Sequence, residues 1–156
     1  MGKKLKQWLK QDKFEDLNQE VLLNLLVTAY FLRSKYEAVM SKYGLTMPQY
    51  NVLRILKGIY PEGHPRFDII SRMIEPAPDV TRIIDNLIKA KLVERFNSKK
   101  DKRLSMSRIT EKGIKLLNQV HPEVKVLGNY FSSALTNSEK RTLSNLLEKI
   151  YGMQVE

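Results

Sequence analysis

Residues 78–113, PDVTRIIDNLIKAKLVERFNSKKDKRLSMSRITEKG, constrain the fold more than any other stretch of the chain. Apolar residues recur at helical spacing over residues 80–88, which predicts a helix that buries one face. The apolar residues of 92–96 then predict a short strand, and the alternation of apolar residues with serines over 104–107 predicts a half-buried return strand. The turn between the two strands, residues 97–103, is too charged to bury.

A helix followed directly by a basic β-hairpin is the arrangement of a winged helix-turn-helix. The helix enters the major groove of DNA, and the hairpin tip, or wing, reaches the backbone and a neighbouring minor groove. The alternative is a helix and hairpin that only pack a core and leave a charged tip in solvent. The order of elements and the distribution of charge favour DNA binding over a plain core. After the hairpin, Thr110, followed by Glu111, predicts the N-cap of the next helix.

The excess positive charge is confined to two segments. The chain of 156 residues has 27 Lys and Arg against 17 Asp and Glu, a net charge of +10. Residues 1–10 contribute +4, since they hold four lysines and no acid, and residues 82–112 contribute +6, since they hold ten basic and four acidic residues. The remainder balances, with 13 of each sign. A nucleic-acid site is expected to concentrate charge in this way.

The hairpin also resembles a known family. Residues 101–113, DKRLSMSRITEKG, are similar to the wing signature of the multiple-antibiotic-resistance regulator (MarR) family, which runs Asp-Arg-Arg, a short strand, then Leu-Thr-x-x-Gly. Val-Thr-Arg at 80–82 and Leu-Val-Glu-Arg at 92–95 match the family's recognition helix and the start of its wing. The resemblance covers about residues 17–151.

Three positions depart from the family pattern. Lys102 stands where arginine is usual, which keeps the charge, and Ile109 replaces leucine. Lys91 stands where the family has glycine before Leu-Val. If that position has a left-handed backbone, lysine there costs about 1 kcal/mol.

The predicted fold class is mainly α with a small β-hairpin wing, a winged helix-turn-helix with a helical dimerisation platform. Residues 12–42 predict one long helix, and its central part, 21–32, is apolar almost all round. A helix without a polar face should be buried on several sides, which a self-complementary homodimer interface would achieve. The single domain is expected to span 1–156, with a dimerisation region at 12–43 and 111–152 and a DNA-binding lobe at 46–110.

The remaining elements follow from caps and prolines. Thr46 predicts a helix start, residues 58–65 a loop, and residues 67–74 the first helix of the helix-turn-helix. A helix over 111–135 should kink near Pro122. The sequence 136–139, Thr-Asn-Ser-Glu, predicts a capping box before the last helix. Residues 1–11 are expected to be a frayed basic tail or a helix extension.

The basic turn supplies one group of predicted DNA contacts. Arg103 is expected in a narrow minor groove, whose negative potential attracts arginine. Asp101 either holds the Arg103 guanidinium or forms the turn by accepting from its own backbone. Phosphates are expected to be neutralised by Lys99, Lys100 and Lys102.

The helix before the turn supplies the other group. Thr81 and Arg82 lie early in it, where side chains and free backbone N–H groups can meet phosphates and base edges. Asp79 and Asn86 are expected to contact bases. Further phosphate candidates are Arg66 and Ser71.

The resemblance also implies a pocket for a small anionic aromatic effector between the dimer platform and the DNA-binding lobe. The residues expected near that junction are Tyr30, Arg33, Tyr36, Met40, Met47 and Tyr50. Aromatic and methionine side chains at helical spacing equally suit a plain core. An effector can change DNA binding only if it binds one arrangement of the two DNA-binding helices better than another.

Other classes of protein are disfavoured. The chain has no cysteine, which excludes disulfides and fits a cytoplasmic protein, and no signal peptide is recognised. Its longest uncharged apolar run has twelve residues, against about 20 for a membrane span. No nucleophile motif, phosphate loop, cofactor motif or metal-ligand spacing is present, and His64 and His121 are far apart. The sequence therefore predicts a homodimeric DNA-binding regulator and no enzyme, with a protein-interaction module or an architectural DNA-binding protein as alternatives.

Overall fold

The computed structural model describes residues 2–152, and the chain divides into two compact units at residues 47 and 48. The first unit contains a short helix α1 (Lys3–Leu9) and a long helix α2 (Leu17–Lys42). α1 is a separate helix whose Leu5 is buried, so the prediction of a frayed tail or an extension of α2 was wrong. The prediction that the long helix starts at residue 12 was also wrong, because residues 12–16 lie outside α2.

The start of α2 is fixed by Asp16. Its side chain accepts a hydrogen bond of 2.8 Å from the backbone N–H of Gln19, so it satisfies one of the free donors of the first turn. The same hydrogen bond lowers the pKa of the Asp16 carboxyl. Within the single chain α2 leaves several large apolar side chains exposed: Leu17, Val21, Leu22, Leu26 and Tyr30.

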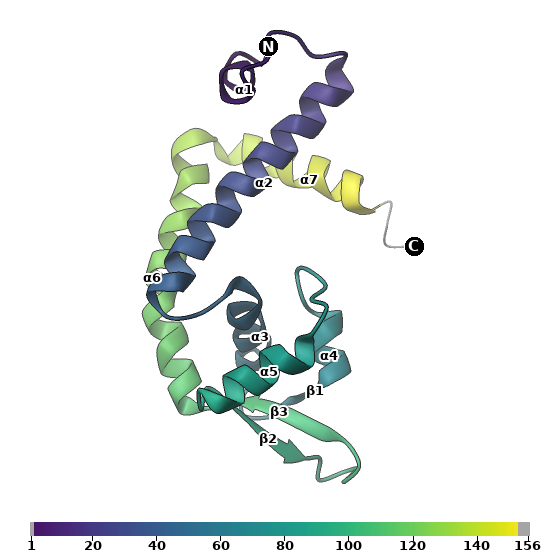
Figure 1. The fold of residues 1–156 in the computed structure, drawn as a ribbon, viewed down its shortest axis with the longest axis vertical. Coiled ribbons are helices and arrows are strands. Elements are labelled where there is room, and N and C mark those ends of the chain that lie inside the picture. The colour runs from purple at the N-terminus through teal and green to yellow at the C-terminus, as the bar shows by residue number, and fades with distance from the viewer. Residues whose placement is uncertain (1, 153–156) are drawn as a thin grey trace. The chain divides into compact units, whose positions relative to one another are not determined.

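The second unit is a helical domain with a small antiparallel sheet, which confirms the fold class predicted from the sequence (Figure 1). Its helices are α3 (Met47–Lys57), α4 (Arg66–Ser71), α5 (Val80–Lys89), α6 (Glu111–Ala134) and α7 (Asn137–Tyr151). Its strands are β1 (His64–Pro65), β2 (Val93–Asn97) and β3 (Ser105–Ile109), in the order β1-β3-β2. α5 leads directly into the β2–β3 hairpin, which is called the wing below.

Strand β1 was not predicted. It pairs with the far edge of β3, where His64 lies opposite Ser107, and both side chains are buried. The alternation of apolar residues with serines, which predicted a half-buried strand, did not predict that Ser107 is buried. The chain at Gly63 comes so close that an added Cβ would meet the Ser107 carbonyl oxygen.

The first helix of the helix-turn-helix is shorter than predicted. α4 ends at Ser71, with Arg72 as its C-cap, whereas the sequence had predicted a helix over residues 67–74. The backbone N–H of Ile74 donates instead to the Asn51 side chain on α3, at 3.0 Å. This contact between distant residues replaces the next helical turn.

The predicted caps of the last two helices are confirmed. The Thr110 hydroxyl accepts from the backbone N–H of Gly113 at the start of α6. Thr136 and Glu139 form the reciprocal capping box of α7, and the hydrogen bond from the Thr136 hydroxyl lowers the pKa of Glu139. α6 continues through Pro122, and Figure 1 shows it bending along its course.

The core of the second unit lies where α3, α4, α5 and the sheet meet. Each element contributes side chains that are almost fully inaccessible, namely Leu53, Leu56, Ile69, Ile84, Leu87, Val93 and Ile109. Lys91, between α5 and β2, has φ 60°, so the left-handed backbone considered for this position is present.

Candidate nucleic-acid interface

α5 packs into the second unit through its apolar face, and an N-cap stabilises its first turn. Val80, Ile84 and Leu87 are at most 5% exposed, as the helical spacing predicted. The Asp79 carboxylate accepts a hydrogen bond from the backbone N–H of Arg82 at 2.9 Å, which caps the start of the helix. This cap occupies one oxygen of Asp79, a residue that the sequence had predicted to contact bases.

Two arginines from neighbouring elements hold the flank of α5. The guanidinium of Arg66, at the first position of α4, donates to the Thr81 hydroxyl at 2.8 Å. The guanidinium of Arg95, on β2, lies 2.7 Å from the Asp85 carboxylate. Sequence reasoning missed both contacts, because they join residues 15 and 10 positions apart that no local pattern connects.

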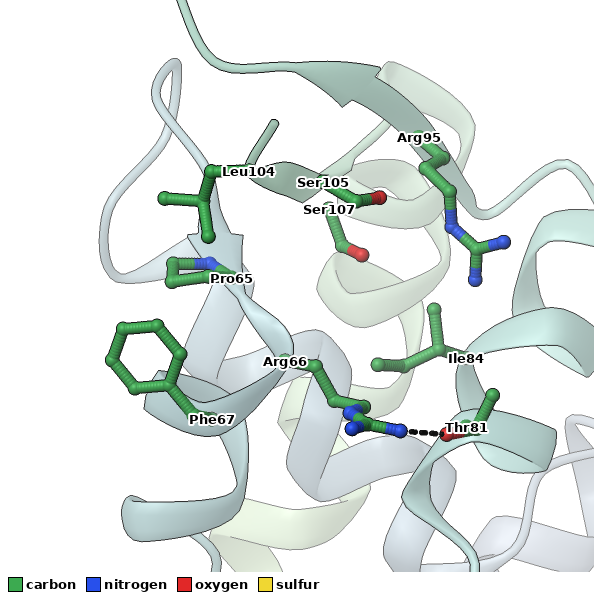
Figure 2. A pocket seen from close by; sticks show the side chains of 9 residues that line it. All are labelled: Pro65, Arg66, Phe67, Thr81, Ile84, Arg95, Leu104, Ser105 and Ser107. Atoms are coloured by element: carbon green, nitrogen blue, oxygen red, sulfur yellow. Dashed lines mark hydrogen bonds between the residues drawn. The ribbon is translucent and has the colours of Figure 1, made fainter. Parts of the chain in front are cut away.

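These two arginines line a cavity of about 430 Å³ between α4, α5 and the wing (Figure 2). Figure 2 shows Arg66 extending to Thr81 along one side, while Phe67 and Leu104 lie on another. Ser105 and Ser107 of β3 also line the cavity, together with Pro65 and Ile84, so apolar and polar groups both face the space.

The tip of the wing is a tight, exposed turn. The Asp101 carboxylate accepts from the backbone N–H of Arg103 at 2.9 Å, and the backbone N–H of Leu104 donates to the Asp101 carbonyl. Of the two roles considered for Asp101, the structure shows the turn-forming one. The Arg103 side chain therefore projects from a turn that is fixed at its base.

Four cations surround this turn without ionic partners. Lys99, Lys100, Lys102 and Arg103 are all exposed, and none forms a salt bridge to any residue in the part of the chain that the structure describes. By contrast, Arg108 in the middle of β3 is bound to Glu94 at 2.7 Å and stacks on the Phe96 ring at 5.0 Å. The wing thus stabilises its stem internally and leaves its tip charge available for an anion.

The residues predicted to line an effector pocket belong to both units. In the first unit, Tyr30 and Arg33 are exposed, Tyr36 and Met47 are half-buried, and Met40 is fully buried. In the second unit, Tyr50 is buried and its hydroxyl accepts from Arg54 at 3.3 Å. It lines a cavity of about 570 Å³ between α3 and α6, which also contains Lys57 and His121.

The described residues form neither a metal-binding cluster nor a membrane-spanning helix. Over residues 2–152, no group of three or more His, Cys, Asp and Glu side chains is placed to hold a metal ion. In the same residues, no helix combines the length and the apolar character needed to span a bilayer.

Comparisons with known proteins agree with this geometry. No model of a known protein family matches the sequence. The HTH-type transcriptional regulator MhqR of Bacillus subtilis is 29% identical over 110 residues, which are 70% of this chain and 74% of MhqR. The Staphylococcus aureus MepR–DNA complex has a similar fold, with a TM-score of 0.75 at 21% identity, covering 83% of this chain and 94% of that one.

A further solved structure is similar in sequence as well as in fold. The MarR transcription factor from Planctomyces limnophilus is 32% identical, with a TM-score of 0.66, and the match covers 87% of this chain and 98% of that one. Identity at this level over nearly the whole of both chains, together with the helix α5 and the basic wing, places this chain in the MarR family of winged helix-turn-helix transcription factors.

Proposed function

We propose that this chain is a sequence-specific repressor of transcription that binds a pseudo-palindromic operator as a homodimer. The observation that carries the proposal is the set of four exposed, unpaired cations at the wing tip beside the polar face of α5. Two α5 helices would enter successive major grooves about 34 Å apart, with the wings flanking them. A dimer bound to a promoter in this way would block transcription.

Exposed apolar side chains support the homodimer. α2 exposes Leu22 and Leu26 at 55% and 57%, and α7 in the other unit exposes Leu146 and Ile150 at 51% and 47%. Monomeric soluble proteins rarely expose contiguous apolar patches of more than a few hundred Å². A second copy presents the same faces, so it can cover them about a two-fold axis.

Sedimentation tests the homodimer. Leu26→Glu places a charge on a side chain that is already exposed within the chain, so the monomer should remain folded while the dimer dissociates. Lys35→Glu is the matched control, because it introduces the same carboxylate at an exposed polar position of α2. A Leu26→Glu protein that sediments as a dimer would remove α2 from the interface.

Selection of duplexes from random DNA, followed by titration of the selected duplex against scrambled DNA across a salt series, tests the proposed activity. A two-fold symmetric site preferred by about 10³ or more is expected for a sequence-specific dimer. Equal and steeply salt-dependent binding to both duplexes would indicate phosphate contacts alone, the architectural alternative. Binding to neither would favour a protein-interaction module.

A small aromatic anion is the proposed effector that releases the operator. Proteins of similar fold include CouR from Rhodococcus jostii, solved with p-coumaroyl-CoA, and Bordetella bronchiseptica BpsR, whose DNA binding is regulated by 6-hydroxynicotinic acid. In this chain Tyr50 lines a cavity together with the cationic side chains of Arg54 and Lys57, which would suit an anion. Operator affinity measured with and without each of these two compounds tests the proposal, and a ligand that binds without changing that affinity would contradict it.

A further inference from the structure

α5 presents one outward stripe of side chains. Successive residues of an α-helix are rotated by about 100°, so Arg82, Asn86 and Lys89 fall within a stripe about 60° wide, opposite the buried face. All three residues are exposed. None of their side chains forms a hydrogen bond or an ion pair within residues 2–152. The stripe is therefore free to contact another molecule.

Thr81 and Asp85 lie on a different line along α5. They are rotated by about 100° from Arg82 and Asn86 respectively, toward the wing. Both side chains are already occupied, Thr81 by Arg66 at 2.8 Å and Asp85 by Arg95 at 2.7 Å. A side chain held in this way would have to break its contact before it could bond to a base. These two contacts instead fix how α5 is rotated about its own axis.

The chemistry of the outward stripe matches particular bases. A guanidinium offers two parallel donors to O6 and N7 of guanine, and a side-chain amide offers a donor and an acceptor to N6 and N7 of adenine. Lysine is a flexible point charge that suits a phosphate. Thr81, by comparison, has a single hydroxyl, which gives no base-specific pair of bonds.

We propose that Arg82 contacts a guanine and Asn86 an adenine in each half of the operator. Thr81 and Asp85 are positioning residues, held by α4 and the wing so that the stripe faces the bases. Lys89 neutralises a backbone phosphate at the other end of α5. This inference rests on the proposed function, and it specifies which bases the operator must contain.

The spacing limits where the two bases lie. Arg82 and Asn86 are separated by about 6 Å along the helix axis, since each residue rises about 1.5 Å. Base pairs are stacked about 3.4 Å apart. The guanine and the adenine are therefore expected within about two base pairs of each other, at the same place in both half-sites.

The experiment compares the sites that the wild-type dimer and its variants select from random duplexes. Arg82→Ala should lose the preference for guanine at one position of each half-site, and Asn86→Ala should lose the preference for adenine at the other. The loss at each position should be roughly 10- to 100-fold, the usual discrimination of a bidentate pair. Arg82→Lys and Asn86→Gln should retain much of it, because lysine and glutamine can contact the same base edges.

Base analogues identify which atom of the base each side chain contacts. Replacing the guanine by 7-deazaguanine removes the N7 acceptor, which should weaken binding by wild-type protein and leave Arg82→Ala unaffected. Replacing the adenine by 7-deazaadenine should likewise weaken binding by wild-type protein and leave binding by Asn86→Ala unaffected. Thr81→Val and Asp85→Asn are the controls for a positioning role. They should lower affinity by a similar factor for every sequence and keep the same preferred bases.

The outcomes distinguish a failure of the proposed function from a failure of the assignment of Arg82 and Asn86 to bases. If wild-type protein selects no symmetric site, the proposed function fails together with this assignment. If it selects one, but Arg82→Ala and Asn86→Ala select the same bases at every position, the assignment alone is overturned. Circular dichroism and thermal unfolding of each variant show whether the protein remains folded, and the conservative variants test the same contacts where an alanine variant is unstable.

Discussion

The Arg95 guanidinium lies 2.7 Å from the Asp85 carboxylate and thereby joins β2 of the wing to α5. Both side chains are between 40% and 50% exposed, at 47% and 43%, so water screens the pair. We expect a double-mutant cycle of Asp85→Ala and Arg95→Ala, followed by urea unfolding, to give a coupling free energy of about 0.2–1 kcal/mol. Additive effects of the two substitutions would show that the pair does not stabilise the fold.

The wing tip should contribute directly to DNA affinity. Arg103→Ala is expected to weaken operator binding by about 1–3 kcal/mol and to leave the oligomeric state unchanged, because the side chain is exposed at the end of a turn. Fluorescence anisotropy with a labelled operator measures the loss. Lys115→Ala, at an exposed position on α6, removes the same charge and serves as the control. Equal affinities of Arg103→Ala and wild type would exclude the wing tip from the interface.

Alanine substitutions at two glycines of α6 should change the stability of the protein in opposite directions. A Cβ at Gly113 would clash with the Leu92 carbonyl oxygen, which belongs to the backbone and cannot easily move. We expect Gly113→Ala to destabilise the protein by about 1–3 kcal/mol in thermal unfolding. A Cβ at Gly128 would meet no atom within 4 Å apart from the adjoining backbone of α6 itself, so Gly128→Ala should stabilise α6 by about 0.5–1 kcal/mol. Similar effects at both positions would contradict the close approach at Gly113.

Lys91 is expected to destabilise the turn between α5 and β2. Its φ of 60° is unfavourable for a residue with a side chain. After the greater entropy of glycine in the unfolded chain is allowed for, Lys91→Gly should stabilise the protein by about 0.5–1 kcal/mol. The matched control is Lys89→Gly, within α5, which should destabilise by a similar amount. Chemical denaturation measures both, and a destabilised Lys91→Gly protein would show that lysine is not strained here.

The capping box of α7 should weaken in acid. The hydrogen bond from Thr136 holds the Glu139 pKa below its ordinary value, so the carboxylate stabilises the folded state above the unfolded-state pKa. That contribution is lost as pH falls through the lower, folded-state pKa. Glu139→Gln keeps the capping geometry without a titrating group. Its melting temperature should therefore fall less than that of wild type between about pH 5 and about pH 3, which lie above and below the ordinary carboxyl pKa of about 4. Identical pH profiles would contradict this role.

Local patterns predicted the elements that local interactions determine. The apolar spacing of α5 and the caps at Thr110 and Thr136 depend on residues within a few positions of one another. The left-handed backbone at Lys91 was raised only as a condition, because the resembling family has glycine at that position. The charge around the wing tip could likewise be located from the sequence, because exposed lysines and arginines were concentrated there.

Contacts between distant residues account for what was missed. β1 exists because His64 pairs with Ser107, and neither residue has a pattern that predicts a strand of two residues. The separation of α1 from α2 also escaped prediction, since helical propensity alone does not place the cap at Asp16. The same limit applies to the interface, where Arg66 and Arg95 reach α5 from other elements.

The order of the sheet also bears on solubility. β3 is paired on both sides, so the outer edges belong to β1, which has two residues and includes Pro65, and to β2, which carries Glu94 and Arg95. A short strand, a proline and charged side chains are the features that prevent a free edge from recruiting a strand of another molecule. The two free edges of the sheet are therefore poor templates for pairing with a strand of another copy.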